Sequence, residues 1–261
     1  MNLVVDFNNA VHRARAGMRF GENSITYTFM LMIRKMVEQF SPSRVYIVRE
    51  GKAIARKEMF SEYKSQRTSP GDDFWRQHSK ILELLSKMPV VIIKHPEREC
   101  DDTIAHIVNV IRKNEECVVV SSDSDFTQLL SMNDDRVKLY NPIKKSYVEP
   151  THYDYVYWKS LVGDSSDNIP GFRGVGPKKA EKLLSSESTL KEFLSEGDNK
   201  KIFDRNISLI RFEDIDSGLD IGEKKVDWEG FREEIQSLGF KSICDDKPWK
   251  KFVESFSTIG E

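Results

Sequence analysis

Short runs of β-branched and apolar residues alternate, in the first half of the chain, with longer stretches of helical periodicity. The runs LVV, VYIV, VVII and CVVV occupy residues 3–5, 45–48, 90–93 and 117–120, and polar or turn residues bound each of them. Strands separated by helices in this way are typical of a parallel sheet. We therefore predict an α/β fold with a parallel-sheet core.

Residues 23–40 give the clearest connecting helix. Asn23 or Ser24 can cap its start. Apolar side chains that suit a core recur at helical spacing: Ile25, Phe29, Met32, Met36 and Phe40. Beyond about residue 151 helical patterns take over, without an internal repeat or a long linker. We predict two regions that pack together, a core over residues 1–155 and a helical region over residues 156–261.

The composition is that of an ordinary globular chain of 261 residues, with 39% apolar and 31% charged residues. No basic segment followed by an apolar run stands near the N-terminus, and no apolar stretch approaches the length of a membrane span. Cys100, Cys117 and Cys244 are too few and too scattered for a disulfide framework or a C-x-x-C zinc site. We expect a cytoplasmic protein with reduced thiols and no membrane contact.

The formal net charge of −2 hides an asymmetry along the chain. Residues 49–67 and 168–182 are rich in Lys and Arg, whereas residues 211–236 are rich in Asp and Glu. A polyanionic partner would therefore bind through the two basic segments and not through the chain as a whole.

Carboxylates follow the predicted strands at the edge where α/β sheets carry their chemistry. With a further pair in LVGDSSDNIPGFRGVGPKKA, they are Asp6, Glu99, Asp101, Asp102, Asp123, Asp125, Asp164 and Asp167. Each one alone is better explained as a helix cap. Together they would repel one another unless divalent cations such as Mg²⁺ lie among them. Two such ions can clamp the oxygens of a phosphodiester displacement, so the set favours a two-metal nuclease.

A glycine-rich turn follows the last acidic pair. Gly174 and Gly176 allow the backbone to turn tightly and to present bare N–H groups to a phosphate. Pro177 suits the first position of the next helix, which continues with Lys178 and Lys179. A plain turn is the alternative, but the acidic pair before it favours contact with a nucleic-acid backbone.

The segment FSEYKSQRTSP, residues 60–70, places Tyr63, Lys64 and Arg67 on one face if it is helical. A solvated surface helix is the plain interpretation. Beside an acidic centre, Lys64 and Arg67 could stabilise charge on a phosphate, and Tyr63 could stack on a splayed base. We expect these three side chains to contact nucleic acid.

In this order, the motifs between Asp6 and Leu184 resemble those of the 5′-nucleases, or flap endonucleases. These occur as stand-alone phage enzymes and as the N-terminal domain of bacterial DNA polymerase I. The most specific stretch, residues 161–180, resembles the family's last metal-binding aspartates and its helix-three-turn-helix DNA-binding motif. RECDDTIAHIV and VVVSSDSDFTQLL resemble the family's E-x-D-D and S-x-D-x-D segments.

The resemblance implies a PIN-like nuclease core with a helical gateway over about residues 56–88, followed by the helix-three-turn-helix region. Lys64 and Arg67 would contact the scissile phosphate. Gly174, Val175 and Gly176 would grip the duplex, at a place where the family also binds K⁺. The implied metal ligands are Asp6, Glu99, Asp101, Asp123, Asp125, Asp164 and Asp167, with Asp102 behind them.

The implied reaction is Mg²⁺-dependent hydrolysis of DNA at 5′ flaps, nicks, branched duplexes or 5′ ends, with Mn²⁺ as a substitute for Mg²⁺. It would leave 5′-phosphate and 3′-hydroxyl ends, and an RNA–DNA hybrid is an alternative substrate. The resemblance also implies a monomer that removes primers during replication, beside replication proteins, in a bacterial cell or a phage-infected host.

One position departs from the family pattern. Arg49 stands where the family has an aspartate after the second strand, with Glu50 next to it. Either Glu50 substitutes, or one metal site is weakened because an arginine repels a cation. The second case would leave a flap-binding or junction-binding protein with little cleavage. A PIN-type ribonuclease would not need the glycine turn, and a haloacid dehalogenase phosphatase would need an acid where this chain has Asn8.

Overall fold

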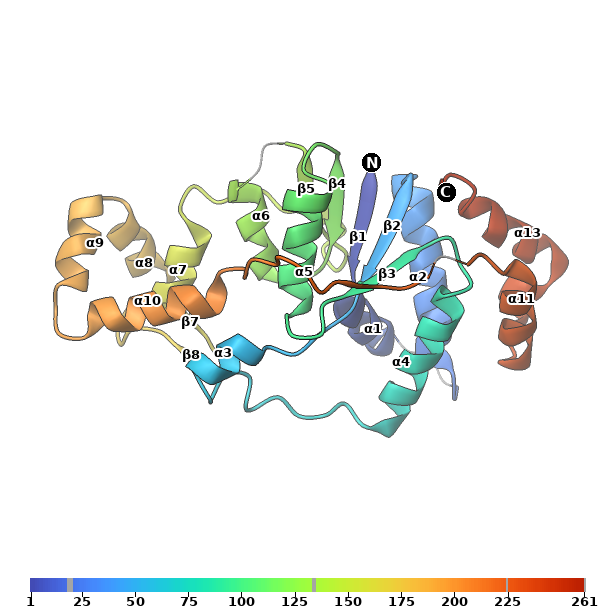
Figure 1. Ribbon diagram of the computed structural model, residues 1–261, viewed down its shortest axis with the longest axis horizontal. Coiled ribbons are helices and arrows are strands. Elements are labelled where there is room, and N and C mark those ends of the chain that lie inside the picture. The colour runs from blue at the N-terminus through green and yellow to red at the C-terminus, as the bar shows by residue number, and fades with distance from the viewer. Residues whose placement is uncertain (18–20, 133–134, 224, 261) are drawn as a thin grey trace.

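The computed structural model describes residues 1–17, 21–132, 135–223 and 225–260. A seven-stranded sheet forms its centre, in the order β6-β5-β4-β1-β2-β3-β9 (Figure 1). The strands are β1 (Asn2–Asp6), β2 (Arg44–Val48), β3 (Val91–Lys94), β4 (Cys117–Val120), β5 (Val137–Asn141), β6 (Ser146–Tyr147) and β9 (Asp220–Ile221). The central strands are parallel, and β6 and β9 run antiparallel to their neighbours. All four predicted strands are confirmed, and the fold is α/β as expected.

Helices connect these strands and continue beyond them. In the first half they are α1 (Phe7–Ala16), α2 (Ser24–Phe40), α3 (Ile54–Met59), α4 (Asp72–Leu85), α5 (Cys100–His106) with a π-helical turn at Ile107–Ile111, a 3₁₀ turn at Ser124–Phe126, and α6 (Thr127–Met132). Later ones are α7 (Tyr155–Val162), α8 (Pro177–Leu184), α9 (Glu187–Leu194), α10 (Asn199–Ile210), α11 (Trp228–Ser237), α12 (Lys241–Cys244) and α13 (Asp246–Ser255). No helix within the described ranges is long and apolar enough to span a bilayer.

The strands bury both of their faces, because successive side chains point to opposite sides of the sheet. Leu3 and Val5 of β1 face one apolar cluster with α2 and α4, whereas Val4 between them faces a second cluster with α5 and Phe126. Helices therefore cover both faces of the parallel strands, which explains why those strands are apolar without alternation. This layering leaves the C-terminal ends of the strands free to carry a site.

Helices α7 to α10 form a separate unit at one end of the sheet, and a small ribbon of β7 (Gly163–Asp164) and β8 (Ile169–Pro170) connects α7 to α8 within it (Figure 1). This unit has its own apolar cluster around Leu161 and Phe203. After α10 the chain returns, pairs β9 with β3, and packs α11 to α13 beside α2 at the opposite end (Figure 1). The last helices therefore pack with the N-terminal core, and not with the helical region in which the sequence placed them.

The gateway segment differs from its prediction. α3 ends at Met59, and residues 61–66 form turns in which Lys64 has a φ of 55°. A left-handed residue cannot continue an α-helix, so the predicted helical face through residues 63–67 is wrong. The later part of the predicted gateway is packed against the main core, because α4 buries Phe74 and Ile81 there.

Candidate metal centre

A cleft of about 720 Å³ opens at the C-terminal edge of the parallel strands. Its acidic lining residues are Asp6 at the end of β1, Glu50 after β2, Glu99 and Asp101 at the start of α5, and Asp123 after β4. Lys64 and Arg67 from the gateway segment line the same cleft. Parallel strands end at one edge, and this topology brings together carboxylates that are far apart in the sequence.

Several of these carboxylates also cap the helix or turn that follows them. Asp6 accepts the backbone N–H of Asn9 at 3.0 Å, and Asp123 accepts that of Asp125 at 2.9 Å. Glu99 forms a reciprocal capping box with the third residue of α5. A carboxylate offers about four acceptor positions, and a cap uses one of them. The capping role and a ligand role are therefore compatible.

Asp6, Glu50, Asp101 and Asp123 form no ion pair with a Lys or Arg in the part of the chain that the structure describes, and we call them the unpaired group. Burial, with a contribution from Asp123, raises the pKa of Asp6 to about 6. Burial together with Asp123 and Asp6 raises the pKa of Asp101 well above its ordinary value. Glu50 is open to the cleft on one side, yet loss of water around it raises its pKa to about 7. Lys64 opposes the rise in the pKa of Glu50 and of Asp101 without forming an ion pair with either of them.

Asp125, Asp164 and Asp167 form a second set, which we call the paired group. Among the described residues, they are the acids whose ligand oxygens all lie within 4.8 Å of one another. Lys159 of α7 contacts Asp125 and lies 2.6 Å from Asp164 Oδ2, while Arg67 pairs with Asp167. Although burial opposes it, Lys159 holds the pKa of Asp164 below its ordinary value. Burial raises the pKa of Asp125 to about 6 in spite of Lys159.

A close crossing of the backbone positions the two aspartates of the β7–β8 ribbon. Gly163 has a φ of 85°, and a Cβ on it would lie 2.3 Å from the backbone nitrogen of Gly171. A Cβ on Gly171 would lie 2.0 Å from the carbonyl oxygen of Val162. Only glycine permits this approach, so both glycines are needed for the ribbon that carries Asp164 and Asp167.

Tyr63 lies beneath the carboxylates. Its hydroxyl donates to Glu99 Oε2 at 2.8 Å and to Asp167 Oδ2 at 3.3 Å. The residue is 3% exposed, because its ring packs against Ile169 and Leu209. The expected stacking of Tyr63 on a base is therefore contradicted. Its neighbour Lys64 contacts Glu99 and lies 3.6 Å from Asp167, so the gateway is tied to the acidic centre through side chains.

Asp102 turns away from the cleft. It is fully buried, and both of its oxygens accept hydrogen bonds from Arg56 at 2.7 Å. Arg56 also donates to Glu99 at 2.6 Å and to the carbonyl oxygen of Leu209 at 3.0 Å. The guanidinium saturates Asp102 and links α3, α5 and α10. Asp102 therefore does not fit the role of a direct metal ligand, and it lies behind the cleft carboxylates, as the resemblance implied.

Of the two residues that follow β2, Glu50 lines the cleft. Arg49 is absent from the described residues that line the cleft. Desolvation and the nearby Arg49 lower the pKa of His78 to about 4, which indicates that the Arg49 charge lies toward α4. The one-residue substitution considered for Glu50 therefore agrees with the geometry, and the repulsive arginine does not enter the cleft.

The glycine-rich turn presents its backbone to solvent. Gly174 has a φ of 75°, and a Cβ on Gly174 or on Gly176 would meet no atom within 4 Å. Val175 between them is buried in the cluster of α7 and α8, so only its backbone can reach a ligand. Lys178 and Lys179 are exposed at the start of α8. This geometry suits contact with a phosphate backbone.

Sequence patterns did not single out Lys159 or Arg56, although each contacts two acids of the centre. A lone Lys in a helix and an Arg in a basic segment resemble surface residues, since nothing in the sequence shows which acid faces them. The one feature of the sequence that could have pointed to these two residues is their position in predicted helices next to the acidic motifs.

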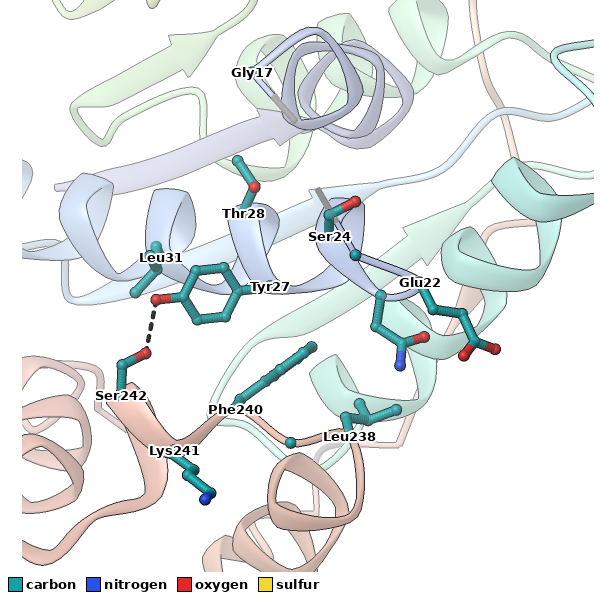
Figure 2. A pocket seen from close by; sticks show the side chains of 13 residues that line it. Gly17, Glu22, Ser24, Tyr27, Thr28, Leu31, Leu238, Phe240, Lys241 and Ser242 are labelled. Atoms are coloured by element: carbon teal, nitrogen blue, oxygen red, sulfur yellow. Dashed lines mark hydrogen bonds between the residues drawn. The ribbon is translucent and has the colours of Figure 1, made fainter. Parts of the chain in front are cut away.

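A further pocket lies elsewhere. It has a volume of about 790 Å³ and lies between the start of α2 and the turn that joins α11 to α12 (Figure 2). Tyr27 hydrogen-bonds Ser242 across it at 2.7 Å. None of the carboxylates described above lines it. This pocket lies at the contact between α2 and the C-terminal helices.

The chain matches two family models. One, described as 5'-3' exonuclease, N-terminal resolvase-like domain, matches residues 2–159. The other, described as 5'-3' exonuclease, C-terminal SAM fold, matches residues 150–214. Both acidic groups and the glycine-rich turn lie within these matched residues.

Relatives with similar sequences carry the same description. The 5'-3' exonuclease of Mycoplasmopsis pulmonis is 31% identical over 204 residues, which cover 73% of this chain and 68% of that protein. The 5'-3' exonuclease of Aquifex aeolicus is 29% identical over 87% of this chain and 86% of its own length. The DNA polymerase I of Bacillus subtilis is 28% identical over 93% of this chain, which spans only 32% of the polymerase.

Solved structures share the fold. The T5 D15 protein co-crystallised with metal ions superposes with a TM-score of 0.67 at 19% identity, covering 98% of this chain and 99% of that protein. Flap endonuclease-1 from Methanococcus jannaschii superposes with a TM-score of 0.63 at 17% identity, covering 99% and 92%.

Proposed function

The chain belongs to the 5'-3' exonuclease family, and from that premise we propose that it is a structure-specific 5′ nuclease with 5′-3′ exonuclease and flap endonuclease activity. It would hydrolyse phosphodiester bonds of DNA at 5′ flaps, nicks and ends with divalent metal ions. The observation that carries this proposal is the convergence of carboxylates from separate segments at one cleft, whose Lys64 and Arg67 also contact Asp167 of a second acidic group.

The residues suit divalent ions of the Mg²⁺ type. All the acidic ligands are oxygens, which hard cations prefer, and Mn²⁺ accepts the same set. Crowded acids with raised pKa values, such as Asp6 and Asp101, are stabilised as carboxylates by a nearby cation. One ion would be held by the unpaired group with Glu99, and another by the paired group. When bound, such ions supply a metal-activated water and stabilise the charge of the leaving oxygen.

The chain's own basic groups complete the chemistry. Lys64 and Arg67 line the cleft, where either can turn from its carboxylate partner toward a phosphate. A guanidinium and an ammonium there would stabilise the negative charge that develops on the phosphate in the transition state. Arg67 is the better placed to move, since its side chain is 54% exposed whereas that of Lys64 is 14% exposed.

Duplex DNA would be held at a distance from the cut. The backbone of Gly174 to Gly176 and the exposed Lys178 and Lys179 would contact phosphates without reading sequence. A K⁺ ion at this turn is part of the proposal. We further propose that the protein acts as a monomer in the cytoplasm, removes primers during replication beside replication proteins, and accepts RNA–DNA hybrids.

The binding-protein alternative loses its main support. It required Arg49 to occupy the metal site, but the cleft is lined by Glu50. A carboxylate at this place adds to the ligands instead of repelling an ion.

The test is a digestion of 5′-labelled flap, nicked and single-stranded substrates across a Mg²⁺ titration. The proposal expects cleavage near the flap junction that is absent with EDTA and that rises with Mg²⁺. Tight flap binding without cleavage at any concentration of Mg²⁺ or Mn²⁺ would favour the binding-protein alternative.

A further inference from the structure

Lys159 places a side-chain cation inside the paired group. The residue comes from α7 and is 7% exposed. Its Nζ contacts Asp125 and lies 2.6 Å from Asp164 Oδ2. The oxygens of the paired group lie within 4.8 Å of one another, so an ion that they bind would share its ligands with this ammonium.

The ammonium forms ion pairs with both Asp125 and Asp164. A charged ammonium and a divalent ion that share one carboxylate are a few ångströms apart, where their repulsion is strong. Binding of an ion to Asp125 and Asp164 therefore requires Lys159 to release at least one of them.

The unpaired group has no such competitor. Lys64 lowers the pKa of Asp101, but its ion pairs are with Glu99 and Asp167. An ion that binds Asp6, Asp101 and Asp123 breaks no ion pair of these three acids among the described residues and relieves the repulsion among them. Two sites built from the same residue type should therefore differ in affinity.

We propose that Lys159 holds the place of the second divalent ion until that ion arrives, so that the paired group binds its ion more weakly than the unpaired group does. This inference rests on the proposed function, because it assumes that both groups bind ions. Lys159 keeps Asp125 and Asp164 together in the metal-free protein and yields to an ion at higher concentration. It is a positioning residue for the carboxylates.

Calorimetric titration of the metal-free protein with Mn²⁺, without DNA, measures both affinities. We expect two binding events in the wild type, with the second at least about tenfold weaker. Lys159→Met removes the ammonium and keeps the apolar stem, so the weak event should tighten by about tenfold or more. A second event that is unchanged or weaker in Lys159→Met would overturn the inference.

Lys200→Met is the matched control. It also removes a lysine that pairs with an aspartate, Asp204, but both side chains are more than half exposed. Surface pairs of this kind contribute little, so both binding events should match those of the wild type.

Thermal stability gives a second measurement. Without metal, Lys159→Met should melt at a lower temperature, since Asp125 and Asp164 lose their counter-ion, and Mn²⁺ should raise its Tm more than that of the wild type. If this variant does not fold without metal, Lys159→Gln serves for both measurements, because its amide donates hydrogen bonds without a charge. Equal Tm shifts in the wild type and the variant would contradict the inference.

The two proposals fail in different ways. A wild-type protein that binds no Mn²⁺ and cleaves no flap would refute the proposed function. A wild-type protein that cleaves flaps and binds two Mn²⁺ ions with equal affinity would refute the role of Lys159 alone.

Discussion

The unpaired and the paired groups consist of the same type of side chain, yet the protein treats their charge in opposite ways. Asp6 and Asp101 face one another without a basic partner, and their pKa values rise. Asp164 and Asp167 bind Lys159 and Arg67 directly. One group forms no ion pair with a basic side chain among the described residues, whereas the other has basic partners within the chain. Proximity of acids therefore does not by itself fix how strongly a site binds an ion.

Arg56 shows a third treatment of charge, because it holds Asp102 in a fully buried ion pair. It is 3% exposed and neutralises Glu99 and Asp102 while it satisfies two backbone carbonyls. The three arrangements lie within one edge of the sheet. The negative charge is fully balanced by Arg56 in the first cluster, partly balanced by Lys159 and Arg67 in the paired group, and not balanced by an ion pair in the unpaired group at the cleft.

Loss of one unpaired carboxylate should have the largest effect. Asp123→Asn removes a charge from the cleft and leaves a neutral amide that can still accept the Asp125 N–H. Flap cleavage should fall by about a thousandfold or more, since a weakened ion no longer stabilises the transition state. Binding of the flap in Ca²⁺ should persist.

The control for this change is Asp204→Asn, which removes an exposed aspartate that pairs with Lys200. Its cleavage rate should match that of the wild type. Near-normal turnover of Asp123→Asn would refute the metal role of the unpaired group.

The compensated cluster should respond through stability. Arg56→Met leaves Asp102 buried without its ion-pair partner and Glu99 with Lys64 alone, and the free energy of unfolding should drop by about 3 to 5 kcal/mol. Urea unfolding measures this loss. Arg76→Met, which removes an exposed pair with Asp73, should change it by less than about 1 kcal/mol. Equal effects of the two variants would show that the Arg56 cluster contributes nothing special.

The unpaired group should make metal-free stability depend on pH. The pKa of Asp6 is about 6 in the folded protein but near its ordinary value of 3.8 in the unfolded chain, so the folded state binds more protons between them. The stabilising contribution is present below about pH 4 and is lost as the pH rises through about 6, an effect of about 2 to 3 kcal/mol for this shift.

Urea unfolding at about pH 5 and about pH 7.5, with and without Mg²⁺, measures this dependence. The stabilisation by Mg²⁺ should be larger at the higher pH, where the acids are charged and need the ion. Asp6→Asn removes the titrating group and should flatten the difference. A stabilisation that is the same at both pH values in the wild type would contradict the assignment.

Changes at the glycine-rich turn should separate binding from the acidic centre, with the smallest effect. Gly176→Asp puts a negative charge where a phosphate is expected, and duplex affinity should fall by about tenfold. Gly176→Ala is the control, because its Cβ has open space and the backbone φ of −95° is ordinary. Unchanged affinity in Gly176→Asp would return this segment to the status of a plain turn.

The fold and the acids at the strand ends were predictable, because short apolar runs such as CVVV are typical of buried strands and parallel strands share an edge. The gateway was not, because the left-handed conformation of Lys64 and the burial of Tyr63 come from tertiary contacts that override a helical pattern. The sequence of a helix such as α11 shows that one face is apolar, but it does not show which part of the protein that face packs against. The pairing of Lys159 was hidden for the same reason.

Anomalous scattering from crystals soaked in increasing concentrations of Mn²⁺ tests most directly whether the two groups are unequal metal sites. The first peak should appear among Asp6, Asp101 and Asp123, and a second should appear at higher concentration among Asp125, Asp164 and Asp167, with Lys159 withdrawn from at least one partner. A first peak in the paired group, or no peak in either group, would contradict the account.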